Sequence, residues 1–144
     1  MLKLYPALNT HDEYLQMLAQ LEKQTTQIEY ALVDKNDTKF IELFTSDIVW
    51  KKETKQWWAT TTSRKTQLYR VKASGKLFKA LRKYETFFHY YVSERCSGKA
   101  DVWEETDFGL NDIAFFDNIH HEPLLYTTTH EGILCVSDAL KLNT

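Results

Sequence analysis

The stretch DIVWKKETKQWWATTTSRKTQLYRVKASGKLFKALRKY, residues 47–84, contains the signals that decide the fold class. Its first half is rich in β-branched and aromatic residues, which suit a pleated and half-buried surface. Ser74 then has the position of a helix N-cap, and the apolar residues behind it recur on one face of an amphipathic helix. Before that helix, an antiparallel meander is expected, with strands at Ile48–Trp50, Gln56–Thr62 and Gln67–Lys72 and charged connectors at Lys51–Lys55 and Ser63–Lys65.

A longer helix is expected before this stretch. Thr10 and Glu13 have the spacing of a capping box, which satisfies two backbone donors at a helix N-terminus. Apolar or neutral residues then recur at alternating steps of four and three as far as Leu32, which predicts a helix over about residues 11–34. The same row of apolar residues could pair two copies of the chain, so both a monomer and a homodimer through the 11–34 helix are possible.

The C-terminal part of the chain again has the composition of strands, expected at Asp112–Asp117, Leu124–Thr129 and Ile133–Val136. Residues 87–92 fit either a strand or a continuation of the second helix. The whole order predicts a single α+β domain over residues 1–144. In it, a long N-terminal helix precedes an antiparallel, meander-like sheet of about five to six strands, and the second amphipathic helix is inserted between the strand groups.

The composition fits a folded domain. Of the residues, 43% are hydrophobic and 14% aromatic, far from the profile of a disordered chain. The first residues lack the apolar stretch of a signal peptide, and the longest apolar run is too short to span a bilayer. We therefore expect a cytoplasmic protein.

Familiar catalytic and metal-binding motifs are missing from the sequence. Cys96 and Cys135 have no C-x-x-C partner, and the sequence has neither G-x-S-x-G nor a P-loop. The groups His120-His121-Glu122 and His130-Glu131 do not have the spacing of a metal site. We expect no metal and no cofactor, and an enzyme ranks below the two binding functions described next.

Charge is sorted strongly along the chain, although the net charge is only −2. Residues 1–50 contain 4 basic and 8 acidic side chains, residues 51–100 contain 13 basic and 3 acidic, and residues 101–144 contain 1 basic and 9 acidic. Such segregation bears on partners and association rates rather than on the fold. The acidic and basic thirds could also face each other inside the fold, which would leave less charge for a partner.

The acidic third predicts a surface that binds a basic protein. Carboxylates speed the encounter with such a partner, and buried aromatic anchors supply most of the affinity. An inhibitor of a nuclease requires such an acidic surface, because it must cover a site that binds phosphate and is therefore positively charged. The expected contact residues are Trp103, Glu104, Glu105, Asp107, Phe108, Asp112 and Asp117.

The basic third predicts the alternative, binding of single-stranded RNA or DNA. Eleven positive side chains and one negative side chain lie between Lys51 and Lys83, interleaved with aromatic residues. Cations that follow phosphates beside aromatic faces that stack on bases are typical of such surfaces. The expected contact residues are Trp57, Trp58, Arg64, Lys65, Arg70, Lys72, Lys79 and Lys83.

This small α+β chain is rich in aromatic residues, has few motifs and has an uneven distribution of charge. In these general features it resembles the bacterial immunity proteins, which neutralise a toxin made by related bacteria, often a nuclease. The resemblance implies an antitoxin-like inhibitor that occludes the active site of its target. It rests on no family motif, so no residue role is transferred from it. The sequence thus predicts, in order, a toxin inhibitor that binds protein, a nucleic-acid binder and a small enzyme.

Overall fold

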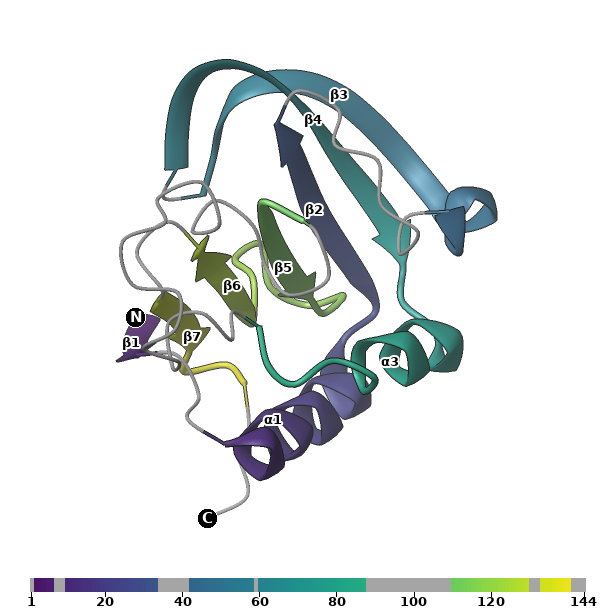
Figure 1. The fold of residues 1–144 in the computed structure, drawn as a ribbon, viewed down its shortest axis with the longest axis vertical. Helices are drawn as coiled ribbons and strands as arrows, with labels where there is room; N and C mark the ends of the chain where they lie inside the picture. Colours follow the sequence, from purple (N-terminus) through teal and green to yellow (C-terminus); the bar gives the residue numbers. More distant parts are fainter. Residues whose placement is uncertain are drawn as a thin grey trace.

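The computed structural model describes residues 2–6, 10–33, 42–58, 60–87, 110–129 and 133–140, which form two α-helices and a seven-stranded antiparallel sheet (Figure 1). Neighbouring strands follow the order β1-β7-β6-β5-β2-β4-β3. The expected α+β class, with an N-terminal helix and a second helix between strand groups, is confirmed. The elements are β1 (Leu2–Pro6), α1 (His11–Gln24), β2 (Gln27–Val33), a 3-10 turn (Thr45–Asp47), β3 (Ile48–Trp57), β4 (Thr60–Lys72), α3 (Gly75–Leu81), β5 (Asp112–Phe116), β6 (Leu125–Thr128) and β7 (Ile133–Ser137).

Both helices pack on one face of the sheet and contribute to a single main core. Apolar side chains alternate along the strands, so that Ile28 and Tyr30 of β2 face the helices while Glu29 and Ala31 face the other way. The helix residues in this core are Tyr14, Met17, Leu18 and Leu21 of α1 and Leu77, Phe78, Ala80 and Leu81 of α3. No helix among the described residues is long and apolar enough to cross a membrane.

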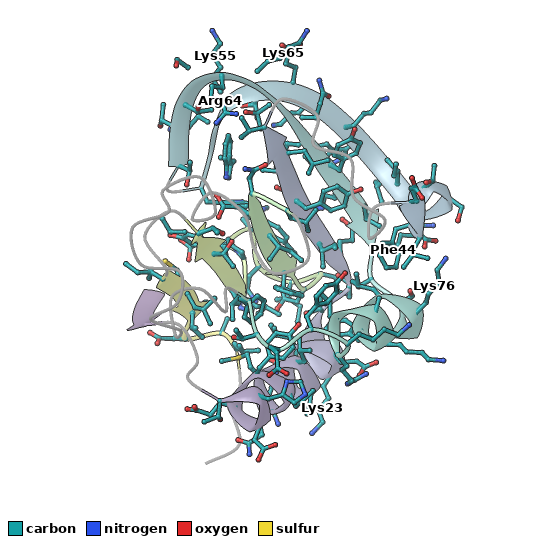
Figure 2. All side chains as sticks on the ribbon, viewed as in Figure 1. Lys23, Phe44, Lys55, Arg64, Lys65 and Lys76 are labelled. Carbon is teal, nitrogen blue, oxygen red and sulfur yellow. The ribbon has the colours of Figure 1, made fainter. Side chains whose placement is uncertain are left out.

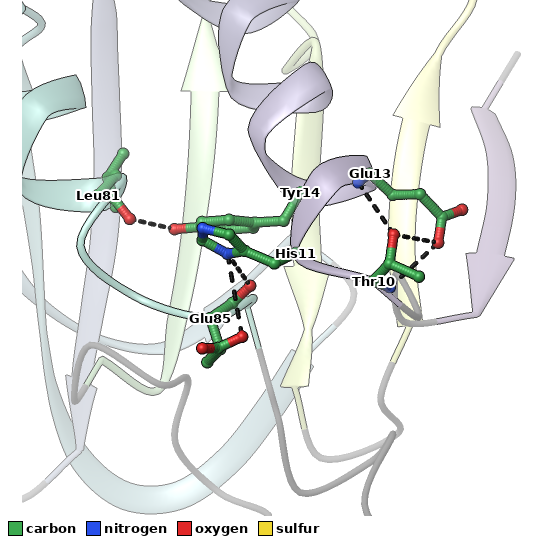
Figure 3. Close-up of polar contacts among 6 residues, drawn as sticks. All are labelled: Thr10, His11, Glu13, Tyr14, Leu81 and Glu85. Carbon is green, nitrogen blue, oxygen red and sulfur yellow. Dashed lines mark hydrogen bonds and ion pairs between the residues drawn. The ribbon is translucent and has the colours of Figure 1, made fainter.

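Helix α1 begins where the capping box is expected (Figure 3). The Oγ1 of Thr10 accepts a hydrogen bond from the Glu13 amide at 3.1 Å, and the Glu13 carboxylate accepts one from the Thr10 amide at 3.1 Å. One turn further along, the Tyr14 hydroxyl donates to the Leu81 carbonyl at 2.6 Å. The Nδ1 of His11, the first residue of α1, is hydrogen-bonded to the Glu85 carbonyl at 2.9 Å. The start of α1 is therefore tied to the end of α3.

We expect the substitution Thr10→Ala to lower the free energy of unfolding by about 1 kcal/mol, because the Glu13 backbone amide loses the side-chain oxygen that accepts its hydrogen bond. Urea unfolding followed by circular dichroism measures this difference. The matched control is Thr45→Ala, whose exposed hydroxyl donates to the Glu42 carbonyl and caps no helix of the described residues. Equal losses in both variants would contradict a capping role for Thr10.

The expected helix over residues 11–34 is wrong beyond Gln24. Thr25 closes α1 with an extended backbone, φ −84° and ψ 128°, and Gln27–Val33 forms the strand β2 between β4 and β5. The error has a simple origin, because residues four apart share a face in a strand as well as in a helix. Ile28 and Leu32 therefore fit both patterns, and the burial of six of the seven β2 residues hides the alternation.

The expected division of residues 48–72 into three strands is also wrong. Residues 51–55 and 63–65, expected as connectors, lie inside the long strands β3 and β4. Charged residues are tolerated there because the outer part of this hairpin is exposed on both faces, from Lys51 to Glu53 and from Ser63 to Lys65. The turn instead follows Trp57, which pairs with Thr60.

The other strand and helix predictions after residue 72 are confirmed where the structure describes them. Ser74 caps α3, its hydroxyl accepting from the Leu77 amide at 3.4 Å. Strands β5, β6 and β7 occupy the three expected C-terminal positions within one or two residues. The undecided segment lies outside the described residues after Phe87.

Candidate functional site

The β3–β4 hairpin folds over the sheet face opposite the helices. Its register shifts between Ile48 and Trp50 and again between Thr54 and Gln56, and such bulges bend a strand pair. Figure 1 shows both strands arching across the top of the molecule. At the far end of the arch, Trp57 bonds to Asp112 of β5, and Trp58 lies 6.0 Å from Tyr126 of β6, measured between ring centroids.

The turn of this hairpin has an unusual residue in a strained conformation. Trp58 has φ 40°, in the left-handed region that favours glycine and that costs other residues about 1–3 kcal/mol. Its ring packs against the cluster of Ala31, Val33 and Trp57 and also against the cluster that contains Tyr126. We attribute the turn to this packing, since the local sequence lacks a glycine or asparagine.

Asp112 joins three elements from a position that is only 2% exposed. Its Oδ1 accepts from the Thr127 hydroxyl at 2.8 Å, the Thr129 amide at 2.9 Å and the Thr129 hydroxyl at 2.7 Å. Its Oδ2 accepts from the Trp57 indole N–H at 2.7 Å and the Thr60 hydroxyl at 3.4 Å. Burial raises the pKa of the Asp112 carboxyl, against the opposing effect of the hydrogen bonds from Thr129, Trp57 and Thr127.

A cavity of about 270 Å³ lies beside Asp112 under the hairpin. A carboxylate offers about four lone-pair positions, and five donors already surround this one. Asp112 is thus placed to hold the hairpin on the sheet rather than to exchange a proton with a ligand. The cavity is lined by Val33, Trp57, Thr60, Thr61, Thr62, Arg64, Asn111 and Asp112.

A second polar contact lies on the same sheet face. The Arg70 guanidinium donates to the Glu29 carboxylate at 2.6 Å and to the Gln27 side chain at 2.5 Å, and it lies 4.3 Å from the centre of the Phe116 ring. Burial raises the pKa of the Glu29 carboxyl more than Arg70 lowers it. Arg70 therefore has a structural role, because its positive charge pairs with the buried carboxylate of Glu29.

The outer surface of the hairpin, in contrast, has exposed cations. Lys51, Lys52 and Lys55 of β3 and Lys65 of β4 are all exposed, and Figure 2 shows Lys55 and Lys65 pointing away from the body at the top of the arch. The one acid among them, Glu53, lies 3.9 Å from the Lys65 Nζ, with both side chains more than half exposed. An exposed ion pair of this kind contributes little to the free energy of unfolding. We call these four lysines the hairpin cations.

A separate group of lysines lies on and just after α3. Lys76 lies 5.5 Å from the centre of the Phe44 ring, and Figure 2 places it at the opposite end of the arch from the hairpin tip. Lys79 and Lys83 are also exposed. The basic third of the sequence is therefore divided between two surfaces.

The residues expected on a nucleic-acid surface are not all on the outside. Trp57 is 4% exposed, with its indole N–H bonded to Asp112, and Trp58 is half-buried. Arg70 is paired with Glu29. The other expected contacts, which are exposed, are Arg64, Lys65, Lys72, Lys79 and Lys83.

Only two residues of the expected acidic surface are described, and both are engaged in the fold. Asp112 is buried, as above, and Asp117 accepts from the amides of Ile119 and His120 and from the His120 ring. Burial opposes ionisation of Asp117, but these hydrogen bonds outweigh it and lower the pKa of its carboxyl. Outside the described residues lie Trp103, Glu104, Glu105, Asp107 and Phe108.

Lys51, Lys52 and Lys55 were missed as candidate site residues, although a run of lysines beside Trp50 was visible in the sequence. The sequence predicts a connector between two strands at these residues, and only the long hairpin makes them part of a strand edge. Within the part of the chain that the structure describes, no three His, Cys, Asp or Glu side chains are grouped to hold a metal ion.

Comparison with known proteins found no family model, no curated protein and no solved structure that matches this chain.

Proposed function

We propose that this protein binds another protein through the hairpin cations, and that the contacted part of the partner is acidic. The observation that carries the proposal is the position of Lys51, Lys52 and Lys55 on β3, which is the last strand of the sheet, with Lys65 beside them on β4. Exposed charges of one sign speed the encounter with a surface of the opposite sign and suppress other partners.

The aromatic residues of the hairpin favour a protein partner over single-stranded nucleic acid. Base stacking needs accessible ring faces. The ring of Trp57 is buried, Tyr69 stacks on Tyr30 with centroids 5.0 Å apart, and Trp58 packs between two clusters. Trp50 is half-buried, with the Lys52 Nζ 5.2 Å from the centre of its ring. These rings offer little stacking surface beside the lysines, so we rank nucleic acid second.

The inhibitor role predicted from the sequence is a separate proposal, because it uses an acidic surface against a basic partner. A bacterial immunity protein that occludes the active site of a toxin would also act through its surface. Its expected acidic contacts near Glu104 lie outside the described residues, so this role stays a prediction.

The test is capture of partners from native cell extract after nuclease treatment, with two matched variants. Lys51→Glu/Lys55→Glu/Lys65→Glu reverses hairpin cations, and Lys76→Glu/Lys79→Glu/Lys83→Glu makes the same change of charge at α3. We expect a stoichiometric protein partner that is lost with the first variant and kept with the second. Equal capture by both variants, or capture that nuclease abolishes, would contradict the proposal.

A further inference from the structure

We infer that β3 receives an extended acidic segment of the partner protein as an additional antiparallel or parallel strand at the edge of the sheet. This inference rests on the proposed function and specifies how the same surface binds. It concerns the backbone of β3 as well as its side chains, and the two contributions can be tested separately.

The backbone of β3 is paired on one side only. β3 is the terminal strand in the order of the sheet and pairs with β4, and no described strand lies along its other edge. An edge of this kind presents a row of N–H and C=O groups to any extended segment that approaches. Addition of a strand to a sheet edge is a recurrent mode of peptide recognition, in which the backbone supplies affinity and the side chains supply specificity.

The bulges of β3 limit where a partner can pair. The register with β4 is regular from Trp50 to Thr54, and it shifts on either side of that segment. A bulge disrupts the ladder and increases the local twist. The docking footprint is therefore the five-residue segment Trp50–Thr54, which includes Lys51, Lys52 and Glu53 and is flanked by Lys55. The Glu53 carboxylate lies 3.9 Å from the Lys65 Nζ, so the hairpin cations together remain in excess over this one acid.

The charge of this footprint selects the occupant. Lys51 and Lys52 are successive residues, so their side chains point to opposite faces of the strand and can meet carboxylates on both faces of an incoming strand. A second copy of β3 that pairs antiparallel about the middle of this footprint would place the two Lys52 side chains opposite each other, and like charges directly opposite are destabilising. Lysines on an edge strand thus disfavour self-association and favour an acidic segment of a different protein.

The test uses three synthetic peptides of eight residues in which glutamate alternates with valine and threonine, with both ends blocked. The first is unmodified. The second has N-methyl groups on alternate residues, so that it loses the backbone donors of one edge. The third has N-methyl groups on every residue, so that it loses the donors of both edges. Both keep the full charge. Binding to the full chain is measured by fluorescence anisotropy at low salt.

We expect the unmodified peptide and the peptide methylated on alternate residues to bind, and the peptide methylated on every residue to bind at least about tenfold more weakly. The reason is that the second peptide can still present its unmethylated edge to β3, whereas the third has no backbone donor on either edge. Equal binding of all three peptides would overturn strand addition and leave electrostatic binding in place. Unchanged binding by Lys51→Glu/Lys55→Glu/Lys65→Glu would instead contradict the proposed function itself.

Two further results would also overturn the inference. One is failure of all three peptides to bind at low salt, and the other is displacement of the peptide by a single-stranded oligonucleotide that binds more tightly. Amide signals in the NMR spectrum add a positional readout, with the expected changes confined to Trp50–Thr54 and its neighbours. Changes centred on α3 would likewise count against β3 as the docking edge.

Discussion

Replacing Asp112 by alanine should lower the free energy of unfolding by about 3–5 kcal/mol, because it leaves several buried donors without an acceptor. The Trp57 indole and the Thr129 amide can only donate, and each bonds to a different oxygen of Asp112. Without the carboxylate the hairpin also loses its polar contact with β5. Urea unfolding measures the loss, and tryptophan fluorescence reports whether the tip of the hairpin has moved into water.

The variant Asp112→Asn gives a milder and more specific control. In either orientation its amide group would face the Trp57 indole or the Thr129 amide, so we expect a loss of about 1–3 kcal/mol. A loss below about 0.5 kcal/mol in both variants would contradict the joining role of Asp112.

The wild-type protein and Asp112→Asn should also differ in how their stability depends on pH. The carboxyl pKa of Asp112 is raised above its ordinary value of about 3.9, so the folded state holds this proton more tightly than the unfolded state does. Its contribution to stability is therefore complete below about pH 4 and declines as the pH rises through the folded-state pKa. The stability of Asp112→Asn should lack this decline, and identical pH profiles would count against the burial of the charge.

The second large effect is expected from Arg70→Met. The substitution leaves the carboxylate of Glu29, a residue that is 6% exposed, without its cation. Removal of one partner of a buried ion pair costs about 3–5 kcal/mol, and we expect about 2–3 kcal/mol here because the Arg70 side chain is 23% exposed. Thermal or urea unfolding at pH 7 measures the change.

The matched double variant Glu29→Gln/Arg70→Met removes the stranded charge and should regain part of that stability. In Arg70→Met alone, the pKa of Glu29 rises further above its unfolded value, so stability should fall more steeply as the pH rises from 5 to 8. A double variant that is no more stable than Arg70→Met would show that the loss came from packing against Phe116 instead.

The elements that the sequence predicted well have local signals. The capping box at Thr10 and the N-cap at Ser74 depend on residues within three positions of each other. Strands β5, β6 and β7 have apolar runs bounded by turn residues. Such features need no knowledge of distant contacts.

The elements that were missed depend on distant residues. β2 is a strand because β4 and β5 pair with both of its edges, and its sequence alone fits a helix equally well. The hairpin turn at Trp58 lacks turn residues and is held by packing against Tyr126, far along the chain. Likewise, the five donors to Asp112 lie 15 to 55 positions away, so its burial could not be anticipated from the neighbouring residues.

The exposed lysines of the hairpin lie in the basic stretch, residues 51–83, that the charge segregation singles out. The sequence could not separate cations that pair with buried acids, such as Arg70, from those that face solvent, such as Lys55. That separation depends on which strand face each residue occupies, and the long hairpin sets those faces.

The most direct test of the account is a map of backbone hydrogen exchange in this protein with and without its captured partner. Exchange of amides along a strand edge slows when a partner covers or pairs with that edge. We predict that the partner slows exchange most within Ile48–Trp57 and leaves α3 unchanged. Protection confined to other elements, with the exchange of β3 unaltered, would contradict a partner-binding role for the hairpin cations.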